Sequence, residues 1–322
     1  MKKKTARAHH YIPEFYLAGF TDTGGKEGYL EVIDQETGKQ WRTKPKNVAN
    51  HRDFYRINLE EADQNLIEYE LSKIESLAAP VIKKIITKYT LPNNYDYIVL
   101  MNFIALLLTR IPSFRNNIND FISDISKRRL KLITHSKKHW NSNKTKIKNN
   151  GYKFDSNVPY EDMKKFVDNE LYKFKTENKF HNISMFKLLD PLIPLLLYRK
   201  WSLILSINSS YNFVCSDKPI DLAWSKKVSC NFSGPGFGLS NTEVTFPLSS
   251  NVVLYGIFEK NHGVLSASDK LIATINSKTC KNARQIFSSK KDFVWLKKNG
   301  SIGIKSELIE EINKNIGKMK KK

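Results

Sequence analysis

The chain has 322 residues, of which 40% are hydrophobic and 26% are charged. This composition allows one large core or two smaller ones, and it excludes an intrinsically disordered chain. The formal net charge is +21, and because like charges repel, a polyanion such as nucleic acid is one natural explanation for it. The alternative is compositional: lysine and asparagine are abundant throughout, as in proteins from AT-rich genomes.

The cysteines and the apolar stretches of the sequence indicate in which cellular compartment the protein is expected. Cys215, Cys230 and Cys280 are too few and too scattered for a disulfide framework or a zinc site, so a reducing compartment is expected. The basic start is not followed by the apolar region of a signal peptide. The longest apolar run, Tyr97 to Leu108, is shorter than the about 20 residues that cross a membrane. We therefore expect a cytoplasmic protein with no membrane partner, and we find no signal for an oligomeric state.

The first elements along the chain are a hairpin and a helix. Residues 28–43 alternate in polarity around a turn at Gln35 to Gly38, which predicts a β-hairpin. A helix is predicted to begin near Asn58, and Pro80 should kink it or divide it in two. Its apolar face is marked by residues at spacings of three and four, namely Leu71, Ile74, Ala78, Ile82 and Ile85.

The next segment combines buried and strongly basic sequence. A second long helix is predicted from about Asn94 to Leu132, bent at Pro112. Residues 127–153 hold ten Lys and Arg and no Asp or Glu, which indicates an exposed basic loop or a helix extension that ends in one. A third helix is predicted at 160–179. The basic residues expected to contact nucleic acid are Lys127, Arg128, Arg129, Lys131, Lys137, Lys138, Lys144, Lys146 and Lys148.

The remainder of the chain is rich in β-forming residues. Short β-rich runs in residues 201–260 predict an antiparallel sheet, and residues 268–288 predict a helix. The order of elements indicates an α+β fold with an N-terminal hairpin, central long kinked helices, and a C-terminal antiparallel sheet with a covering helix. We expect one domain over residues 1–290 (helical part about 58–200, β-rich part about 201–260, helix about 268–289). A basic extension, 291–322, follows, containing a short amphipathic helix and a lysine tail.

The N-terminal stretch A-R-A-H-H-Y-I-P-E-F-Y-L-A-G-F holds the first candidate site residues, His9 and His10. Histidine can serve as acid, base or metal ligand near neutral pH. Neighbouring residues of a strand point to opposite faces, so the two imidazoles are not expected to act on one atom. The aromatic side chains that follow could anchor the segment and so fix the position of a histidine.

Two further candidates lie in the middle and late parts of the chain. Arg110 follows buried leucines, and Glu75 lies at the edge of the apolar face of the preceding helix, so the two could form a salt bridge between helices or a phosphate clamp. Ser216 and Asp217 end a β-run before a proline, where either a catalytic group or an ordinary turn is expected. Asp217, Glu75 and a histidine could also share a divalent metal ion.

These motifs together resemble the bacterial domain-of-unknown-function family 4238. The resemblance rests on motifs that occur in this order: H-H-Y-I-P-E-F-Y-L-A-G-F, N-V-A-N-H-R-D-F-Y at Asn47 to Tyr55, I-E-S-L-A-A at Ile74 to Ala79, L-L-T-R-I-P-S-F-R at Leu107 to Arg115, F-V-C-S-D-K-P at Phe213 to Pro219, T-F-P-L-S at Thr245 to Ser249, and the Asn276 to Phe287 helix. It covers about residues 8–290 and carries no established activity.

The resemblance implies a shared set of site residues. These are His9, His10, Glu75, Arg110, Arg115, Ser216 and Asp217, and they are expected to meet in space. Lys218 replaces the asparagine that often follows S-D in the family, so that position is not expected to be essential. A basic bacterial protein of this kind would suit a toxin or an antiviral-defence effector.

Two functions are compatible with the sequence. In the first, the protein is a nuclease acting on RNA or single strands: His10 is the general acid or base, Arg110 and Arg115 hold the phosphate, and Asp217 with Glu75 orients the histidine or binds a metal. In the second, the same residues form a structural network, and the protein only binds nucleic acid or another partner. In the nuclease hypothesis, residues 127–153 contact the nucleic-acid backbone.

Overall fold

The computed structural model describes residues 7–56, 64–151, 157–225, 234–290 and 292–319. Its internal contacts divide the chain into two compact units. The first unit contains the residues up to 111 and those from 182 onward, and the second contains residues 112–181. The second unit is therefore one continuous segment inserted into the sequence of the first.

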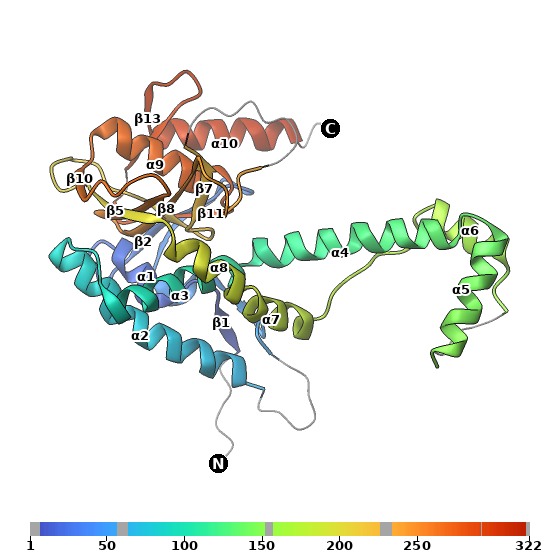
Figure 1. Ribbon diagram of the computed structural model, residues 1–322. Helices are drawn as coiled ribbons and strands as arrows, with labels where there is room; N and C mark the ends of the chain where they lie inside the picture. The colour runs from blue at the N-terminus through green and yellow to red at the C-terminus, as the bar shows by residue number, and fades with distance from the viewer. Residues whose placement is uncertain (1–6, 57–63, 152–156, 226–233, 291, 320–322) are drawn as a thin grey trace, which may run out of the picture. The chain divides into compact units, whose positions relative to one another are not determined.

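The predicted hairpin is present and belongs to a larger sheet of the first unit (Figure 1). Strands β2 (Leu30–Asp34) and β3 (Gln40–Thr43) pair antiparallel. Gly38 has the left-handed φ of 70° that the turn requires. Strands β11 (Gln285–Ser288) and β6 (Cys215–Ser216) complete the sheet in the order β3-β2-β11-β6. The sheet thus joins the beginning of the chain to its last third.

The helix predicted at 268–288 is correct only in its first part. Helix α9 (Asp269–Lys281) is capped by Ser268, whose hydroxyl accepts a hydrogen bond from the Leu271 amide. Residues 285–288 form β11, which pairs with β2 on one side and with β6 on the other. Two partner strands supply hydrogen bonds along this segment and bury Ile286 and Phe287, so tertiary pairing outweighs local helix preference.

The predicted β-rich region contributes a second sheet. Its order is β10-β5-β9-β8-β7. The strands are β5 (Lys200–Leu205), β7 (Asp221–Trp224), β8 (Thr242–Ser249), β9 (Val252–Ile257) and β10 (Val264–Ser266). The pairs are antiparallel except for β10 with β5, which is parallel. Helix α9 covers this sheet by packing Ile272, Ala273 and Ile275 against Ile204 and Val253.

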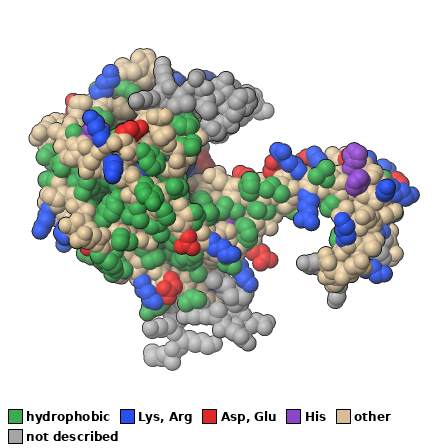
Figure 2. All heavy atoms as spheres, in the orientation of Figure 1, with side chains coloured by type: hydrophobic (Ala, Val, Ile, Leu, Met, Phe, Trp, Pro, Cys, Tyr) green, Lys and Arg blue, Asp and Glu red, His purple; other side chains and the backbone are tan. Residues whose placement is uncertain are grey.

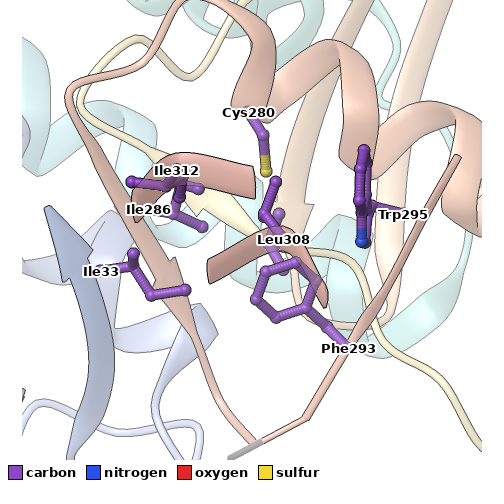
Figure 3. Packing of buried hydrophobic residues seen from close by; sticks show 8 residues of the cluster. Ile33, Cys280, Ile286, Phe293, Trp295, Leu308 and Ile312 are labelled. Atoms are coloured by element: carbon purple, nitrogen blue, oxygen red, sulfur yellow. The ribbon is translucent and has the colours of Figure 1, made fainter. Parts of the chain in front are cut away.

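The C-terminal residues pack into the core of the first unit. Strands β12 (Val294–Leu296) and β13 (Ile302–Ile304) pair, and helix α10 (Lys305–Met319) follows where an amphipathic helix was predicted. Figure 3 shows Phe293, Leu308 and Ile312 gathered with Ile33 and Ile286. Residues 293–312 therefore share a hydrophobic cluster with the N-terminal hairpin. The predicted lysine tail, residues 320–322, lies outside the described residues.

Short elements occupy the N-terminal part of the first unit. They are β1 (Ala8–His10), α1 (Glu14–Leu17), η1 (Ala18–Phe20), η2 (Pro45–Asn47) and β4 (Asn50–Arg52). Strands β1 and β4 form a two-stranded antiparallel sheet. Tyr16 and Leu17 are buried, and the Tyr16 hydroxyl donates a hydrogen bond to the Pro247 carbonyl at 2.5 Å. The apolar N-terminus is therefore an anchored part of the core.

The central helices of the first unit are α2 (Leu66–Lys88), α3 (Asn94–Arg110), α7 (Asn178–Lys187) and α8 (Leu189–Leu197). Helix α2 is continuous through Pro80, so the proline does not divide it. The predicted start, near Asn58, lies outside the described residues, and the described helix begins at Leu66. The helix predicted to run from Asn94 to Leu132 is interrupted at Ile111, whose ψ of 153° is extended, because the residue before a proline is disfavoured in helical conformation.

The second unit is helical. It contains α4 (Pro112–Ile133), α5 (Lys137–Asn149) and α6 (Tyr160–Asp168), and α7 begins at its end. The basic segment is therefore mostly helical, with a break at 134–136 where Ser136 caps α5; its last lysine, Lys153, lies outside the described residues. The helix predicted at 160–179 ends at Asp168 and is followed by a turn at 169–170 and by residues 171–177, which have no regular secondary structure.

The fold class is α+β, as predicted. Within the described ranges, no single helix has both the length and the apolar character of a membrane span. Cys215 and Cys280 are buried free thiols, and burial raises the pKa of each to about 12, which keeps both in the unreactive thiol form. Cys230 lies outside the described residues.

Candidate functional site

The two histidines lie on the short ribbon formed by β1 and β4. His9 pairs with His51 and His10 with Asn50. Because strand side chains alternate, His9 is buried, with 2% of its surface exposed, while His10 is only partly buried. The two imidazoles therefore have different environments, as the sequence predicted.

The ribbon is held in an unusual backbone conformation. Ala49 and Asp53, which flank β4, have left-handed φ angles of 52° and 55°, which cost about 1–2 kcal/mol for a residue other than glycine. The Ala49 carbonyl accepts a hydrogen bond from the Tyr11 amide at 2.9 Å, and the Asp53 amide donates to the Arg7 carbonyl at 2.7 Å. The segment 47–55 thus holds β1 from both ends.

His9 is fixed by Tyr55. The Nδ1 atom of His9 accepts a hydrogen bond from the Tyr55 backbone amide at 2.9 Å, which places the proton of the neutral imidazole on Nε2. The two rings are stacked, with centroids 5.7 Å apart and planes 9° apart. His9 therefore orients the end of the 47–55 segment against β1.

Arg110 is the centre of the cluster. Its Nη1 donates to Glu75 Oε1 at 2.6 Å, its Nη2 to the His10 carbonyl at 2.6 Å, and its Nε to the Tyr55 hydroxyl at 3.1 Å. Burial alone would lower the pKa of Arg110, but Tyr55 and Glu75 outweigh it and the pKa is raised. With 1% of its surface exposed, the guanidinium is paired inside the protein and ties α3 to α2 and to β1.

Glu68 belongs to the same cluster and was not among the predicted residues. Burial raises the pKa of its carboxyl, and the charge of Arg110 opposes the rise. Among the described residues, its Oε2 atom has no hydrogen-bond partner. Glu68 precedes Glu75 by seven residues, two helical turns on one face, so the spacing of the two glutamates was the signal that could have identified it.

His10 is the member of the cluster whose ring lies nearest to solvent. Its Nε2 lies 3.2 Å from the Lys46 carbonyl and its Nδ1 3.7 Å from Glu14 Oε1. Burial lowers the pKa of His10, although Glu14 and the Lys46 carbonyl act against the shift. The imidazole is therefore biased toward its neutral, proton-accepting form.

Ser216 and Asp217 lie at the end of β6 and contact a different part of the chain. Asp217 Oδ1 accepts hydrogen bonds from the Arg284 and Gln285 amides at 2.9 and 3.1 Å, and Ser216 Oγ accepts one from the Lys218 amide at 3.2 Å. Burial raises the pKa of Asp217, although these backbone donors oppose it. These contacts are those of a turn that fastens β6 to β11.

Tyr11 is the link between Asp217 and the histidine ribbon. Burial, and after it the charge of Asp217, raise the pKa of Tyr11. The Tyr11 ring also lies 5.2 Å from the His51 ring and 6.0 Å from the Phe54 ring. The structure therefore joins His10, Glu75 and Arg110 through direct contacts and links His9 to them through Tyr55, and among the described residues Asp217 is related to them through its charge acting on Tyr11.

Arg115 belongs to the second unit. It lies in α4 with 7% of its surface exposed, and after burial its charge is the next cause of the lowered pKa of His181. His181 Nε2 in turn contacts the Thr176 hydroxyl at 2.6 Å. His181, in the same unit, is therefore one of the groups that the charge of Arg115 influences.

The predicted nucleic-acid contacts also lie in the second unit, whose Lys and Arg side chains are visible on the surface in Figure 2. Lys127 and Lys131 both pair with Glu170, at 2.9 and 3.0 Å, and hold the pKa of its carboxyl at about 2. Arg128 pairs with Asp124, and Lys137 lies 4.0 Å from Glu161.

Part of the positive charge of the basic segment is not neutralised by carboxylates of the described residues. Over the described part of the chain, four of the predicted residues have no carboxylate within ion-pair distance and all are exposed. They are Arg129, Lys138, Lys146 and Lys148. Trp140 is buried and fixes α5, and Lys144 lies over its ring at 5.8 Å.

The donor geometry does not assemble the suggested metal centre from the predicted residues. Within the described ranges, no group of three or more His, Cys, Asp or Glu side chains is arranged to hold a metal ion. The Glu75 carboxylate is directed to Arg110 and the Asp217 carboxylate to backbone amides, so neither faces a common point with a histidine.

Comparison with known proteins gives the family. No curated protein and no solved structure matches the chain. The family model described as a protein of unknown function, DUF4238, matches residues 8–292. This range includes the histidine ribbon, Arg110, the second unit and the Ser216-Asp217 turn, and the chain therefore belongs to the DUF4238 family.

Proposed function

We propose that the protein binds nucleic acid through the basic helices of its second unit, and that the cluster around Arg110 is a structural network that holds the N-terminal segment. The observation that carries the proposal is the set of exposed cations at Arg129, Lys138, Lys146 and Lys148, which have no carboxylate partner among the described residues. Phosphate contacts made by Lys and Arg supply most of non-specific nucleic-acid affinity. The net charge of the second unit also supports this proposal. Residues 112–181 contain sixteen Lys and Arg and eight Asp and Glu, which gives a net charge of +8.

The geometry of Arg110 supports the structural role of the cluster. A phosphate clamp needs donors that reach a ligand, whereas the Arg110 donors reach Glu75, Tyr55 and the His10 carbonyl and the side chain is buried. A buried guanidinium that is fully engaged inside the protein positions its neighbours. In this role Arg110 fixes the β1 backbone at His10.

The binding proposal is tested by removing the four unpaired cations together. The variant R129Q/K138Q/K146Q/K148Q is compared with the wild type by fluorescence anisotropy on a labelled single-stranded oligonucleotide at several salt concentrations. Each lost phosphate contact reduces the slope of log K against log salt by about 0.7, so a reduction of about 3 is expected.

A charge-matched control comes from the first unit. The variant K39Q/K88Q/K260Q/K270Q also loses four exposed lysine charges and is expected to bind almost as the wild type does. Equal weakening by both variants would show that net charge alone drives binding and would contradict the assignment to the second unit, as would binding that does not depend on salt.

A second candidate function, a nuclease acting on RNA or single strands, is favoured by His10. Its ring is partly exposed, lies near the Glu14 carboxylate and is biased toward the neutral form, as a general base requires. Arg110 and Glu75 would then position His10 through its carbonyl. Such a nuclease would suit a bacterial toxin or an antiviral-defence effector.

Cleavage assays separate the two candidates. Wild type, His10→Ala and the control His262→Ala, an exposed histidine of the same unit, are compared on single-stranded RNA after their folding is checked by circular dichroism. A nuclease should lose a factor of about 10²–10⁴ on loss of its acid–base residue and retain activity in the control. Absence of His10-dependent cleavage in folded proteins supports binding without catalysis.

A further inference from the structure

A cavity of about 530 Å³ lies in the first unit, and its lining contains none of the residues of the Arg110 cluster. Its walls come from four places: the N-terminal motif, residues 24–26, helix α2, and residues 249–251 where β8 connects to β9. Phe15 and Ala18 come from the motif, and Ile82 and Ile86 from α2. Part of the apolar N-terminal sequence therefore serves as the wall of a cavity.

The cavity is held open by contacts that do not involve a ligand. The Gly19 carbonyl accepts a hydrogen bond from the Ser250 amide at 2.9 Å, and a Cβ at Gly19 would lie 3.1 Å from the Leu248 carbonyl oxygen. The Thr21 hydroxyl oxygen lies 2.9 Å from both the Ala18 and the Gly25 carbonyl oxygens, to one of which it can donate, and it accepts from the Gly25 amide. The Phe15 ring packs against Phe103 at 5.4 Å. A pre-formed apolar cavity of this size is typical of a small-molecule site.

Two lysines provide the charge of the cavity. Lys26 and Lys83 line it, and both are exposed. Among the described residues, neither ammonium group has a hydrogen-bond or ion-pair partner. The lining contains no Asp or Glu, so the site favours a negatively charged group at this position.

The polar groups of the walls are largely engaged within the protein. The Ser249 hydroxyl accepts from the Asn251 amide, Asn251 Oδ1 accepts from Asn212 Nδ2, and the Thr87 hydroxyl donates to the Lys83 carbonyl. Few donors and acceptors therefore remain to read the edge of a nucleobase. An aliphatic chain needs no such partners and gains from contact with Phe15, Ile82 and Ile86.

We propose that this cavity binds an amphipathic anion with a single aliphatic chain, such as a medium-chain carboxylate or alkyl phosphate. The chain lies against Phe15, Ile82 and Ile86, and the anionic head pairs with Lys26 and Lys83. The cavity is separate from the basic helices of the second unit, so nucleic-acid binding can fail without affecting this site.

The test uses isothermal titration calorimetry on the full-length protein, with decanoate and decyl phosphate as probes. Saturable one-site binding of at least one probe is expected. Lys26→Ala/Lys83→Ala should weaken it about tenfold, since two partly exposed ion pairs together contribute about 1.4 kcal/mol. The control Lys39→Ala/Lys88→Ala removes two exposed lysines outside the lining and should retain wild-type affinity.

A cavity-filling variant tests the apolar wall. Ala79→Trp places a large side chain in the cavity from the surface of α2 and should abolish binding while the thermal unfolding midpoint stays near that of the wild type. Decylamine, which has the same chain with a cationic head, should not bind.

Several outcomes overturn the proposal. They are absence of saturable binding by both anions, equal weakening by the two lysine variants, binding that persists in Ala79→Trp, and equal binding of decylamine. Adenosine monophosphate is tested in parallel, and its binding in place of the two anions would also overturn the assignment to an aliphatic chain.

Discussion

The two buried arginines of the first unit and the four exposed cations of the second unit have opposite roles in the structure. In the first unit, Arg110 and Arg199 have 1% and 2% of their surface exposed. Arg199 donates to the Thr242 and Phe237 carbonyls at 3.0 and 2.7 Å, much as Arg110 donates to the His10 carbonyl. In the second unit, Arg129, Lys138, Lys146 and Lys148 are exposed and without carboxylate partners among the described residues. The same residue type therefore fixes the chain in one unit and is available to a ligand in the other.

The difference follows from how each unit is assembled. The first unit joins strands from both ends of the sequence, as in the pairing of Asp34 with Gln285, and its buried arginines lie where such distant segments meet. The second unit is one continuous segment with a small apolar interior that includes Trp140 and Val167. A small core leaves long charged side chains on the surface. The position of an arginine in the fold therefore determines whether its side chain is buried and hydrogen-bonded inside the protein or exposed on the surface.

The largest expected effect tests this contrast directly. Arg110→Ala should lower the free energy of unfolding by about 3–5 kcal/mol, because it leaves a partly buried Glu75 and the His10 carbonyl without their donor. Arg129→Ala should change it by less than about 0.5 kcal/mol, as is usual for an exposed residue. Urea denaturation monitored by tryptophan fluorescence measures both. Similar losses in the two variants would mean that the units do not differ in this way.

A comparison within the first unit sharpens the contrast. Glu68→Met should raise the free energy of unfolding at pH 7 by about 1 kcal/mol, because it removes a buried carboxylate with an unpartnered oxygen. Glu75→Met should lower it by about 3 kcal/mol, since it leaves Arg110 unpaired.

The pH dependence of the unfolding free energy tests the raised pKa of Glu68. A raised pKa means that the folded state binds the proton more tightly than the unfolded state. Wild-type stability relative to Glu68→Met should therefore fall as the pH rises above about 4.5 and through the raised pKa. Destabilisation by Glu68→Met would show that its charge supports Arg110 as Glu75 does.

The smallest expected effect concerns His10. Its lowered pKa means that the unfolded state binds the proton more tightly, so its contribution to stability is present above about pH 6.5 and is lost as the pH falls toward the folded-state pKa. The difference in unfolding free energy between wild type and His10→Gln should shrink in that window. A difference that is constant from pH 5 to 8 would place His10 in a fully solvated environment and would remove the support for its role as a base.

Several parts of the fold and site could be predicted from local sequence. The hairpin at 28–43 was predicted by its alternation and its glycine turn, and the Arg110–Glu75 pair by the opposing faces of two apolar helices. The C-terminal half of the helix predicted at 268–288 was wrong, because Ile286 and Phe287 fit either periodicity and the strands that decide the matter lie about 70 and 250 residues earlier. Glu68 was missed because its environment includes the charge of Arg110, which is remote in sequence.

The sequence by itself determined the α+β class, the anchoring of the aromatic N-terminus, the concentration of basic charge between 127 and 153 and the family. These properties follow from composition, periodicity and motifs, which are local. Only the tertiary structure decided that Arg110 is directed inward to Glu75, Tyr55 and the His10 carbonyl, that Asp217 fastens a turn, and that Phe15 lines a cavity with Lys26 and Lys83. The direction of a side chain and its partners depend on segments that meet only when the chain folds.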